Sequence, residues 1–424
     1  MGAYVLALAK LGDFIQASPL FWSLSQRFKP LALICAQKSV AEAAELMGLF
    51  AEIILVDPKA ATSPSLPFAA TAIYGLSLAP KAVTLAETIR AQYPKAAFFG
   101  PRLHQGTLTL PPAQALAFAI MKENRLWSPF NLVDVWRRVE PDNLASKTLY
   151  WPRPETTLPF EPRPKIGLIL GAGHPKRRWP RERHALLAKE LLTRFEAKVY
   201  LLGGPMEKAL GQAVRLELKA GPDLINLTGK TDLNALAQVI SGLNLLVGSD
   251  TGTLHLGAAL GVPVVGLYFG PAWAKETGPY VANGRVIQTL APCAPCYDDR
   301  HCPYRICRAI PEVATVVKAV SQLLTGETSE PRPDLLVPTI DEFGFKVSSL
   351  DPNPGPETIL ADLVREAARA AVDETYRPQK PQGDLNFKEA KFWRRLTARL
   401  FSNKPTGQGQ ERFLGTLADF SLLA

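Results

Sequence analysis

Four short segments combine acidic, basic and glycine residues in the way that phosphate and hydroxyl chemistry requires. They lie at the ends of predicted buried strands, and they read LGDFIQASP (11–19), GAGHPKRRWP (171–180), LLGGPMEK (201–208) and GSDTGT (248–253). Ligands of parallel α/β sheets bind beyond the carboxyl ends of the strands. These segments are therefore the first candidates for a functional site.

The first segment places Asp13 at the start of a predicted helix, directly after a glycine. A carboxylate held there could take the proton of an attacking hydroxyl group. It could equally be a helix N-cap that only accepts backbone N–H bonds, and caps are far commoner than catalytic carboxylates. The two roles are compatible, and this segment alone leaves both open.

The segment at 248–253 predicts a binding site for phosphate. Asp250 ends a strand, and Thr251 and Gly252 open a helix. Free N–H groups and the positive end of a helix dipole attract anions, and Gly252 would let a pyrophosphate approach the backbone. The alternative is a plain turn capped by Asp250, with His255 packed inside the helix. We favour the binding site because the turn combines an acid, hydroxyls and a glycine.

The other two segments add charge. Lys176 and Arg177 stand beside a predicted helix start, where cations could neutralise a diphosphate leaving group. A solvated basic turn is the alternative. Glu207 could accept a ribose hydroxyl, as acidic residues do in dinucleotide sites. The chain has no GxGxxG fingerprint, which disfavours a nicotinamide or flavin enzyme.

The elements that must position these residues form two α/β units. Predicted strands alternate with helices, the strands lying at 3–9, 31–36, 52–57, 69–76 and 95–100, then at 165–170, 198–204, 244–250 and 262–270. Such alternation is typical of parallel sheets covered on both faces. The segment 151–165 holds five prolines and separates the units as a linker. We therefore expect domains at 1–155 and 156–325, each Rossmann-like and doubly wound.

Residues 326–424 form an expected C-terminal extension that is partly helical. The part 326–355 is rich in proline and acidic residues and predicts a loosely ordered connector, and a helix is expected over 357–375. The basic amphipathic segment 386–401 could lie on an anionic membrane surface, or could dock on the other domains. We slightly favour docking.

Composition narrows the function classes. The chain has 424 residues, 47% of them hydrophobic, and a formal charge of +9, which fits acidic partners. The N-terminus does not have the pattern of a signal peptide, and no apolar run is long enough to span a bilayer, so a cytoplasmic location is expected. Basic residues are dispersed and no nucleic-acid-binding motif occurs, so we expect no nucleic-acid partner.

Four cysteines lie close together in the sequence, at Cys293, Cys296, Cys302 and Cys307. Four thiolates could hold a structural zinc ion or an iron–sulfur cluster. Reduced structural cysteines, or disulfides in an oxidising compartment, are the alternatives. No catalytic role is assigned to this loop at 293–307.

Taken together, these segments resemble glycosyltransferase family 9, the family of the ADP-heptose lipopolysaccharide heptosyltransferases. LGDFIQASP, NLVDVW (131–136), KRRWP, LLGGPMEK, NLTGKTDLNALAQVISGLNLLVGSDTGTLHLGAALGVPVVGLYFG and TGPY follow in the family's order. The resemblance covers about residues 3–323 and is strongest over 198–280. It implies a GT-B fold, with two Rossmann-like domains facing a cleft, and an inverting, metal-independent transfer without a required cofactor.

The resemblance also implies roles for single residues. Asp13 matches the catalytic base, and Asp250, Thr251 and Gly252 match the loop for the donor sugar and pyrophosphate. His255 lies on the same segment, and Arg177 stands where many members carry a lysine.

We therefore expect transfer of a sugar, with ADP-heptose as the donor, to a lipid-linked acceptor of the lipopolysaccharide-core type. The reaction would take place at the inner face of the cytoplasmic membrane, with peripheral contact to anionic lipid. The alternatives are a GT-B enzyme for another nucleotide-sugar, an epimerase, or a noncatalytic nucleotide-sugar-binding scaffold.

Overall fold

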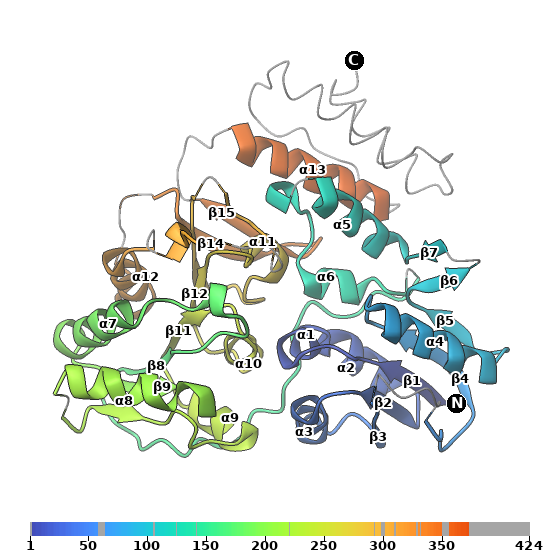
Figure 1. The fold of residues 1–424 in the computed structure, drawn as a ribbon, viewed down its shortest axis with the longest axis horizontal. Coiled ribbons are helices and arrows are strands. Elements are labelled where there is room, and N and C mark those ends of the chain that lie inside the picture. Colours follow the sequence, from blue (N-terminus) through green and yellow to red (C-terminus); the bar gives the residue numbers. More distant parts are fainter. Residues whose placement is uncertain are drawn as a thin grey trace.

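The structure of the chain is a computed structural model. It describes residues 2–57, 64–104, 107–123, 125–140, 142–219, 221–291, 293–297, 302–308, 311–327, 330, 332–349 and 356–372. Two α/β units lie side by side, each with a central sheet between helices (Figure 1). This confirms the two doubly wound units expected from the alternating pattern. The predicted helix at 386–401 lies outside the described residues.

The first domain is built on a parallel sheet of order β3-β2-β1-β4-β5. Its strands are apolar and its inner ones are buried on both faces, as a sheet covered on both sides requires. The strands are β1 (Gly2–Leu6), β2 (Leu31–Cys35), β3 (Glu52–Leu55), β4 (Ala70–Gly75) and β5 (Ala97–Phe99), with the separate pair β6 (Arg102–His104) and β7 (Thr107–Thr109). The helices are α1 (Leu11–Gln16), α2 (Ser18–Arg27), α3 (Lys38–Met47), α4 (Pro80–Gln92), α5 (Pro112–Glu123), the short η1 (Arg125–Trp127) and α6 (Leu132–Arg137).

The second domain has a larger sheet of order β10-β9-β8-β11-β12-β13-β14-β15. Its first six strands are parallel and follow the doubly wound order in which ligands bind at the switch point between the first and fourth strands. These strands are β8 (Lys165–Ile169), β9 (Lys198–Leu202), β10 (Leu224–Asn226), β11 (Leu245–Ser249), β12 (Val264–Tyr268) and β13 (Gly284–Gln288). The helices are η2 (Pro175–Arg177), α7 (Arg181–Arg194), η3 (Pro205–Glu207), α8 (Lys208–Glu217), α9 (Leu233–Ser241), α10 (Gly252–Ala259), α11 (Ala274–Thr277), η4 (Ile306–Arg308) and α12 (Val313–Thr325).

The second sheet continues past residue 325, where the sequence predicted the domain to end. Strands β14 (Leu335–Ile340) and β15 (Phe345–Ser349) extend it as an antiparallel hairpin beside β13. The loosely ordered connector expected over 326–355 is therefore wrong for this part. The proline and acidic residues that suggested it lie largely around the two strands, which are short and whose buried positions stand among half-buried ones.

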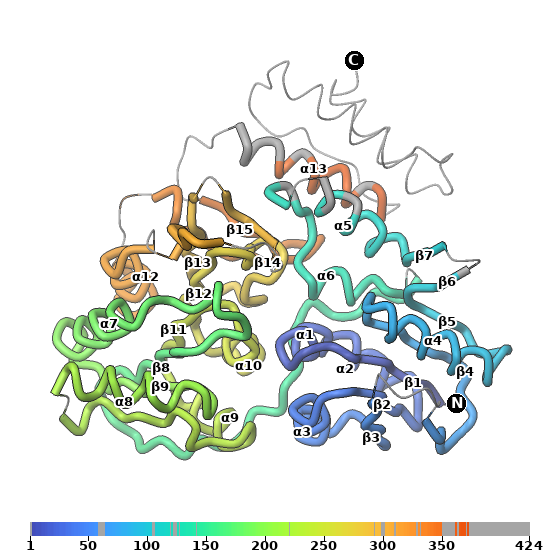
Figure 2. Tube along the Cα trace, in the orientation of Figure 1, coloured from blue at the N-terminus to red at the C-terminus, as the bar shows by residue number. Residues whose placement is uncertain are grey.

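The last described element returns to the first domain. Helix α13 (Pro356–Val372) lies beside α5 and η1, at the top of Figures 1 and 2. The chain crosses between the domains through the proline-rich segment after α6, and it crosses back through α13. Within the described residues, no helix is both long and apolar enough to cross a membrane.

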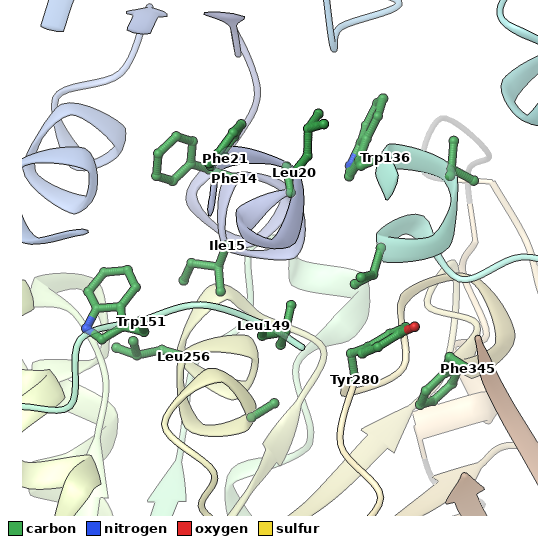
Figure 3. Packing of buried hydrophobic residues seen from close by; sticks show 14 of the residues in the cluster. Phe14, Ile15, Leu20, Phe21, Trp136, Leu149, Trp151, Leu256, Tyr280 and Phe345 are labelled. Atoms are coloured by element: carbon green, nitrogen blue, oxygen red, sulfur yellow. The ribbon is translucent and has the colours of Figure 1, made fainter. Parts of the chain in front are cut away.

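One hydrophobic cluster runs through both domains (Figure 3). Figure 3 shows Phe14 and Ile15 of the first domain above Leu256 of α10, with Trp136 of α6 at the level of Leu20 and, below it, Tyr280 stacked on Phe345. Because buried apolar side chains from both domains pack in the same cluster, the two domains are held in one arrangement rather than joined only by the linker.

A buried polar network also spans the junction, and Asp134 of α6 is at its centre. Its carboxylate accepts hydrogen bonds from the Tyr280 hydroxyl (2.8 Å), from the Arg137 guanidinium (2.9 Å) and from the backbone N–H of Phe345 (2.9 Å). The ring of Phe343 lies under the guanidinium of Arg138, which donates to the Phe343 carbonyl. These contacts fasten α6 to the turn before β13 and to the β14–β15 hairpin.

Candidate functional site

The starts of α1 and α10 meet across the domain junction. A methyl group added at Gly252 would stand 3.2 Å from the backbone nitrogen of Gly12. One added at Gly12 would stand 3.3 Å from the His255 ring. Two glycines therefore allow the first turns of the two helices to approach closely, and they bring together the segments that the sequence singled out in separate domains.

Asp13 lies in the first turn of α1, and the N-cap position belongs to Lys10. The alternative that Asp13 is itself the N-cap is thus wrong. Burial raises the pKa of the Asp13 carboxyl above its ordinary value of 3.8, while the positive charges of His255 and Arg177 oppose the rise and the negative charge of Asp250 adds to it. A carboxylate with a raised pKa is a better proton acceptor than an exposed one.

Asp250, in the second domain, contacts three side chains. The Arg177 guanidinium donates to its Oδ2 at 2.8 Å, and the Thr277 hydroxyl donates to the same oxygen at 3.2 Å. His255 Nε2 lies 3.3 Å from Oδ1. Asp250 and His255 are each 3% exposed, and Nδ1 of His255 has no hydrogen-bond partner among the described residues. The network fixes the His255 ring beside the start of α1.

The start of α10 offers backbone donors. Thr251 is the N-cap residue, yet its side chain makes no capping hydrogen bond in the described structure. The first N–H groups of a helix have no partner within the helix, so they remain available to an anion. Together with Arg177 they form a positively polarised surface facing Asp13.

A second ion pair crosses the junction next to this group, and the sequence reasoning missed it. Arg125 of η1 donates to the Glu276 carboxylate, with Nε 3.1 Å from both oxygens, and also to the carbonyl of Pro271 at 2.8 Å. Burial raises the pKa of Glu276, and Arg125 opposes that rise. No motif in the sequence pointed to this pair, although Glu276 directly precedes TGPY, whose Thr277 and Tyr280 donate to Asp250 and Asp134 respectively.

Two other residues that the sequence predicted to bind the nucleotide-sugar donor lie apart from this group. Glu207 is 3.4 Å from Arg178 and accepts the N–H of Gly204 at 3.0 Å, at the ends of β8 and β9. The ammonium of Lys176 donates to the Tyr297 carbonyl at 3.4 Å, toward the cysteine loop. Among the basic residues at 176–178, Arg177 is therefore the one directed at Asp250, and Arg178 is the one directed at Glu207.

The four clustered cysteines are free thiols, and Cys307 is buried whereas Cys293 is exposed. Burial raises the pKa of Cys296 and of Cys307. Within the part of the chain that the structure describes, no three His, Cys, Asp or Glu side chains are grouped so that they could hold a metal ion. The geometry thus gives no support to the zinc or iron–sulfur hypothesis.

The known proteins that this chain resembles in sequence are heptosyltransferases. The profile of glycosyltransferase family 9 (heptosyltransferase) matches residues 140–305. Lipooligosaccharide heptosyltransferase 2 of Haemophilus influenzae is 34% identical over 155 residues, which cover 36% of this chain and 44% of that protein. Lipopolysaccharide heptosyltransferase 2 of Escherichia coli is 34% identical over 131 residues, 30% of this chain and 37% of that protein. The aligned part thus spans less than half the length of these curated relatives.

Solved structures match over a longer range. A family 9 glycosyl transferase from Veillonella parvula has a TM-score of 0.55 at 21% identity, covering 77% of this chain and 97% of that one. The ADP-heptose lipopolysaccharide heptosyltransferase II of E. coli has a TM-score of 0.55 at 20% identity, covering 78% and 100%. The likeness confirms the expected GT-B fold with its two parallel α/β sheets. The family profile thus matches this chain over residues 140–305, and the fold matches solved structures of glycosyltransferase family 9.

Proposed function

We propose that this protein transfers a heptose from ADP-heptose to a hydroxyl group of a lipopolysaccharide-core-type acceptor, with inversion at the anomeric carbon. One observation carries the proposal: Asp13 of the first domain lies beside His255 and the start of α10 in the second. A proton acceptor thereby faces an anion-binding helix start across the junction, as glycosyl transfer from a nucleotide diphosphate requires. The relatives named above are heptosyltransferases, which supports the choice of sugar.

The reaction assigns a task to each side of the junction. The acceptor oxygen forms a bond to the anomeric carbon while the bond from that carbon to the β-phosphate oxygen breaks. Asp13 takes the proton of the acceptor hydroxyl. The N–H groups at Thr251 and Gly252 and the guanidinium of Arg177 stabilise the negative charge that grows on the leaving ADP.

The remaining predicted residues act around this centre. Asp250 orients Arg177 and His255 through the contacts of 2.8 and 3.3 Å, so it is a positioning residue for the diphosphate. Glu207, at the carboxyl ends of β8 and β9, would accept a ribose hydroxyl of the donor. Lys176 adds positive charge near the cysteine loop. The protein would act in the cytoplasm at the membrane face, where a lipid-linked acceptor is presented.

The test is release of ADP from ADP-heptose with and without a lipid-A–core acceptor. We expect release that depends on the acceptor in the unmodified protein and is lost in Asp13→Asn, while Asp142→Asn, a change of an exposed acid, leaves it intact. Release without acceptor, accompanied by an altered sugar, would instead identify an epimerase. Saturable donor binding without any release would identify a noncatalytic binder.

A further inference from the structure

Arg125, in η1 of the first domain, places its guanidinium among acceptors of the second domain. Its Nε lies 3.1 Å from both oxygens of the Glu276 carboxylate, and one terminal nitrogen donates to the Pro271 carbonyl at 2.8 Å. The other terminal nitrogen donates to the Cys296 carbonyl, and the guanidinium carbon lies 5.4 Å from the centre of the Tyr297 ring. All three nitrogens of this guanidinium therefore bind the second domain.

The contact is largely shielded from water. The side chains of Arg125 and Glu276 are 11% and 7% exposed. A buried ion pair is favourable when further hydrogen bonds satisfy its remaining donors, and the two carbonyls do so here. A planar guanidinium also requires its acceptors in fixed directions, so this contact defines where η1 lies on the second domain.

Helix α11, which carries Glu276, is contacted by the first domain at both ends. Lys275 donates to the Leu126 carbonyl at 3.4 Å, and the amide of Asn131 donates at 3.1 Å to the carbonyl of Gly278, the residue after α11. The helix has four residues, so few hydrogen bonds within it fix its place. Its position therefore depends on these contacts, and the ion pair is the strongest of them because both partners are charged.

The last residue of α11 connects this contact to the candidate active site. The hydroxyl of Thr277 donates to Oδ2 of Asp250 at 3.2 Å, and the same oxygen accepts from the Arg177 guanidinium at 2.8 Å. The partner of Arg125 and a partner of Asp250 are thus consecutive residues. A shift of Glu276 would move a group that holds Asp250 in place.

We propose that Arg125 is a positioning residue for glycosyl transfer, an inference that rests on the proposed function. Through α11 it keeps Asp250, and the cation bound to it, aligned with Asp13 of the first domain. Transfer needs the proton acceptor and the diphosphate site in one geometry, and a displacement of about 1 Å can cost about 10²-fold in rate. Arg125 acts through α11 rather than on the substrate.

The experiment compares Arg125→Gln with the unmodified full chain in three measurements. The single-turnover rate at saturating ADP-heptose and acceptor should fall by about tenfold or more. The dissociation constant of ADP, measured by calorimetry, should rise by no more than about threefold, because the backbone donors of α10 stay in place. Hydrogen exchange at residues 271–280 should become faster, because α11 loses a charged contact.

Two further variants separate positioning from a general loss of stability. Glu276→Gln breaks the pair from the second domain, and the double variant Arg125→Gln, Glu276→Gln should be no slower than the slower single variant, because each change removes the same contact. Arg27→Gln is the matched control, since Arg27 binds Glu140 through two nitrogens, at 2.6 and 2.9 Å, within the first domain. It should lower the melting temperature and leave the transfer rate and the exchange at 271–280 unchanged.

Three outcomes would overturn the inference. A folded Arg125→Gln that transfers as fast as the unmodified protein would show that alignment does not depend on this residue. Unchanged exchange at 271–280 would show that Arg125 does not hold α11. A loss of ADP affinity as large as the loss of rate would place its effect on donor binding instead.

Two provisions keep the test decisive. If Arg125→Gln does not fold, Arg125→Lys takes its place with the same expected split, because it keeps the charge but not the planar fork. An unmodified protein that does not turn over ADP-heptose would count against the proposed function, whereas the exchange comparison would still decide whether Arg125 holds α11.

Discussion

Two aspartates at the same domain junction, Asp134 and Asp13, differ in the groups that surround their carboxylates. Asp134 is 2% exposed and accepts hydrogen bonds from a tyrosine hydroxyl, an arginine and a backbone N–H. Asp13 is partly buried, and burial with the nearby charge of Asp250 raises the pKa of its carboxyl. One carboxylate is saturated with donors, and the other retains the capacity to accept a proton.

The difference teaches how a structural acid can be told from a reactive one. A buried carboxylate surrounded by donors stabilises the fold, because each donor is satisfied and removing any of them leaves a charge unpaired. A carboxylate with a raised pKa is kept in a less favourable state that is useful only if a substrate proton arrives. The changes described below either sharpen or break this contrast.

The largest effect is expected for Asp13→Asn. The amide cannot take a proton, so the rate of transfer should fall about 10²–10⁴-fold, the usual contribution of a general base. Donor binding should persist, because the phosphate contacts lie on the other domain. Single-turnover kinetics and donor titration measure the two separately. A variant that keeps more than half of the activity would show that Asp13 is not the base.

The next largest effect is expected for Gly344→Ala, which disturbs the contacts of Asp134. Gly344 has a φ of +146°, and a methyl group there would stand 2.0 Å from Oδ1 of Asp134. The backbone and the network must both shift, so the free energy of unfolding should fall by about 3 kcal/mol or more. Gly326→Ala, at a φ of +70° with open space around it, measures the smaller cost of a left-handed φ without a steric clash. Equal losses in the two variants would contradict the role of the Asp134 contact.

A smaller loss is expected for Tyr280→Phe, which removes one donor from Asp134. The change should lower the free energy of unfolding by about 1–3 kcal/mol, because a buried carboxylate loses a hydrogen bond. Tyr304→Phe serves as the matched control, since Tyr304 is 83% exposed. Chemical denaturation gives both values. If the two variants unfold alike, the carboxylate of Asp134 does not depend on Tyr280.

Part of this contrast was accessible from the sequence. Asp13, Asp250 and Gly252 stand at strand-to-helix turns, and the general rule for parallel sheets is enough to make them candidates. Their meeting across the junction follows only from the family resemblance or from the structure, because it depends on the packing of one domain on the other.

Other parts could not be foreseen from local patterns. Arg125 and Glu276 are separated by 151 positions, and neither stands in a recognisable motif. The strands β14 and β15 were not predicted, because short strands flanked by proline and acidic residues resemble a connector in composition. The role of Lys176 was open for a similar reason, since which of three adjacent cations faces the site depends on the backbone angles of η2.

The smallest effect concerns pH, and it tests the state of Asp13 directly. Because its pKa is raised in the folded protein, the folded state holds this proton more tightly than the unfolded state does. Stability should therefore fall as pH rises from the ordinary value of 3.8 through the raised folded value, and the penalty should persist at neutral pH. Asp13→Asn should then unfold at a slightly higher temperature than the unmodified protein at pH 7, and the gain should vanish at acidic pH.

The pH dependence of the transfer rate tests the same carboxyl. The rate should fall as pH drops through the raised pKa of Asp13, because the base becomes protonated. His255→Gln should move this fall to higher pH, because a positive charge that opposes the rise of the pKa is lost. Melting curves and rate profiles from pH 4 to pH 8, compared with those of Asp142→Asn, measure both. A variant Asp13→Asn that is less stable than the unmodified protein at pH 7 would mean that Asp13 resembles Asp134 after all, and that its carboxylate supports the fold.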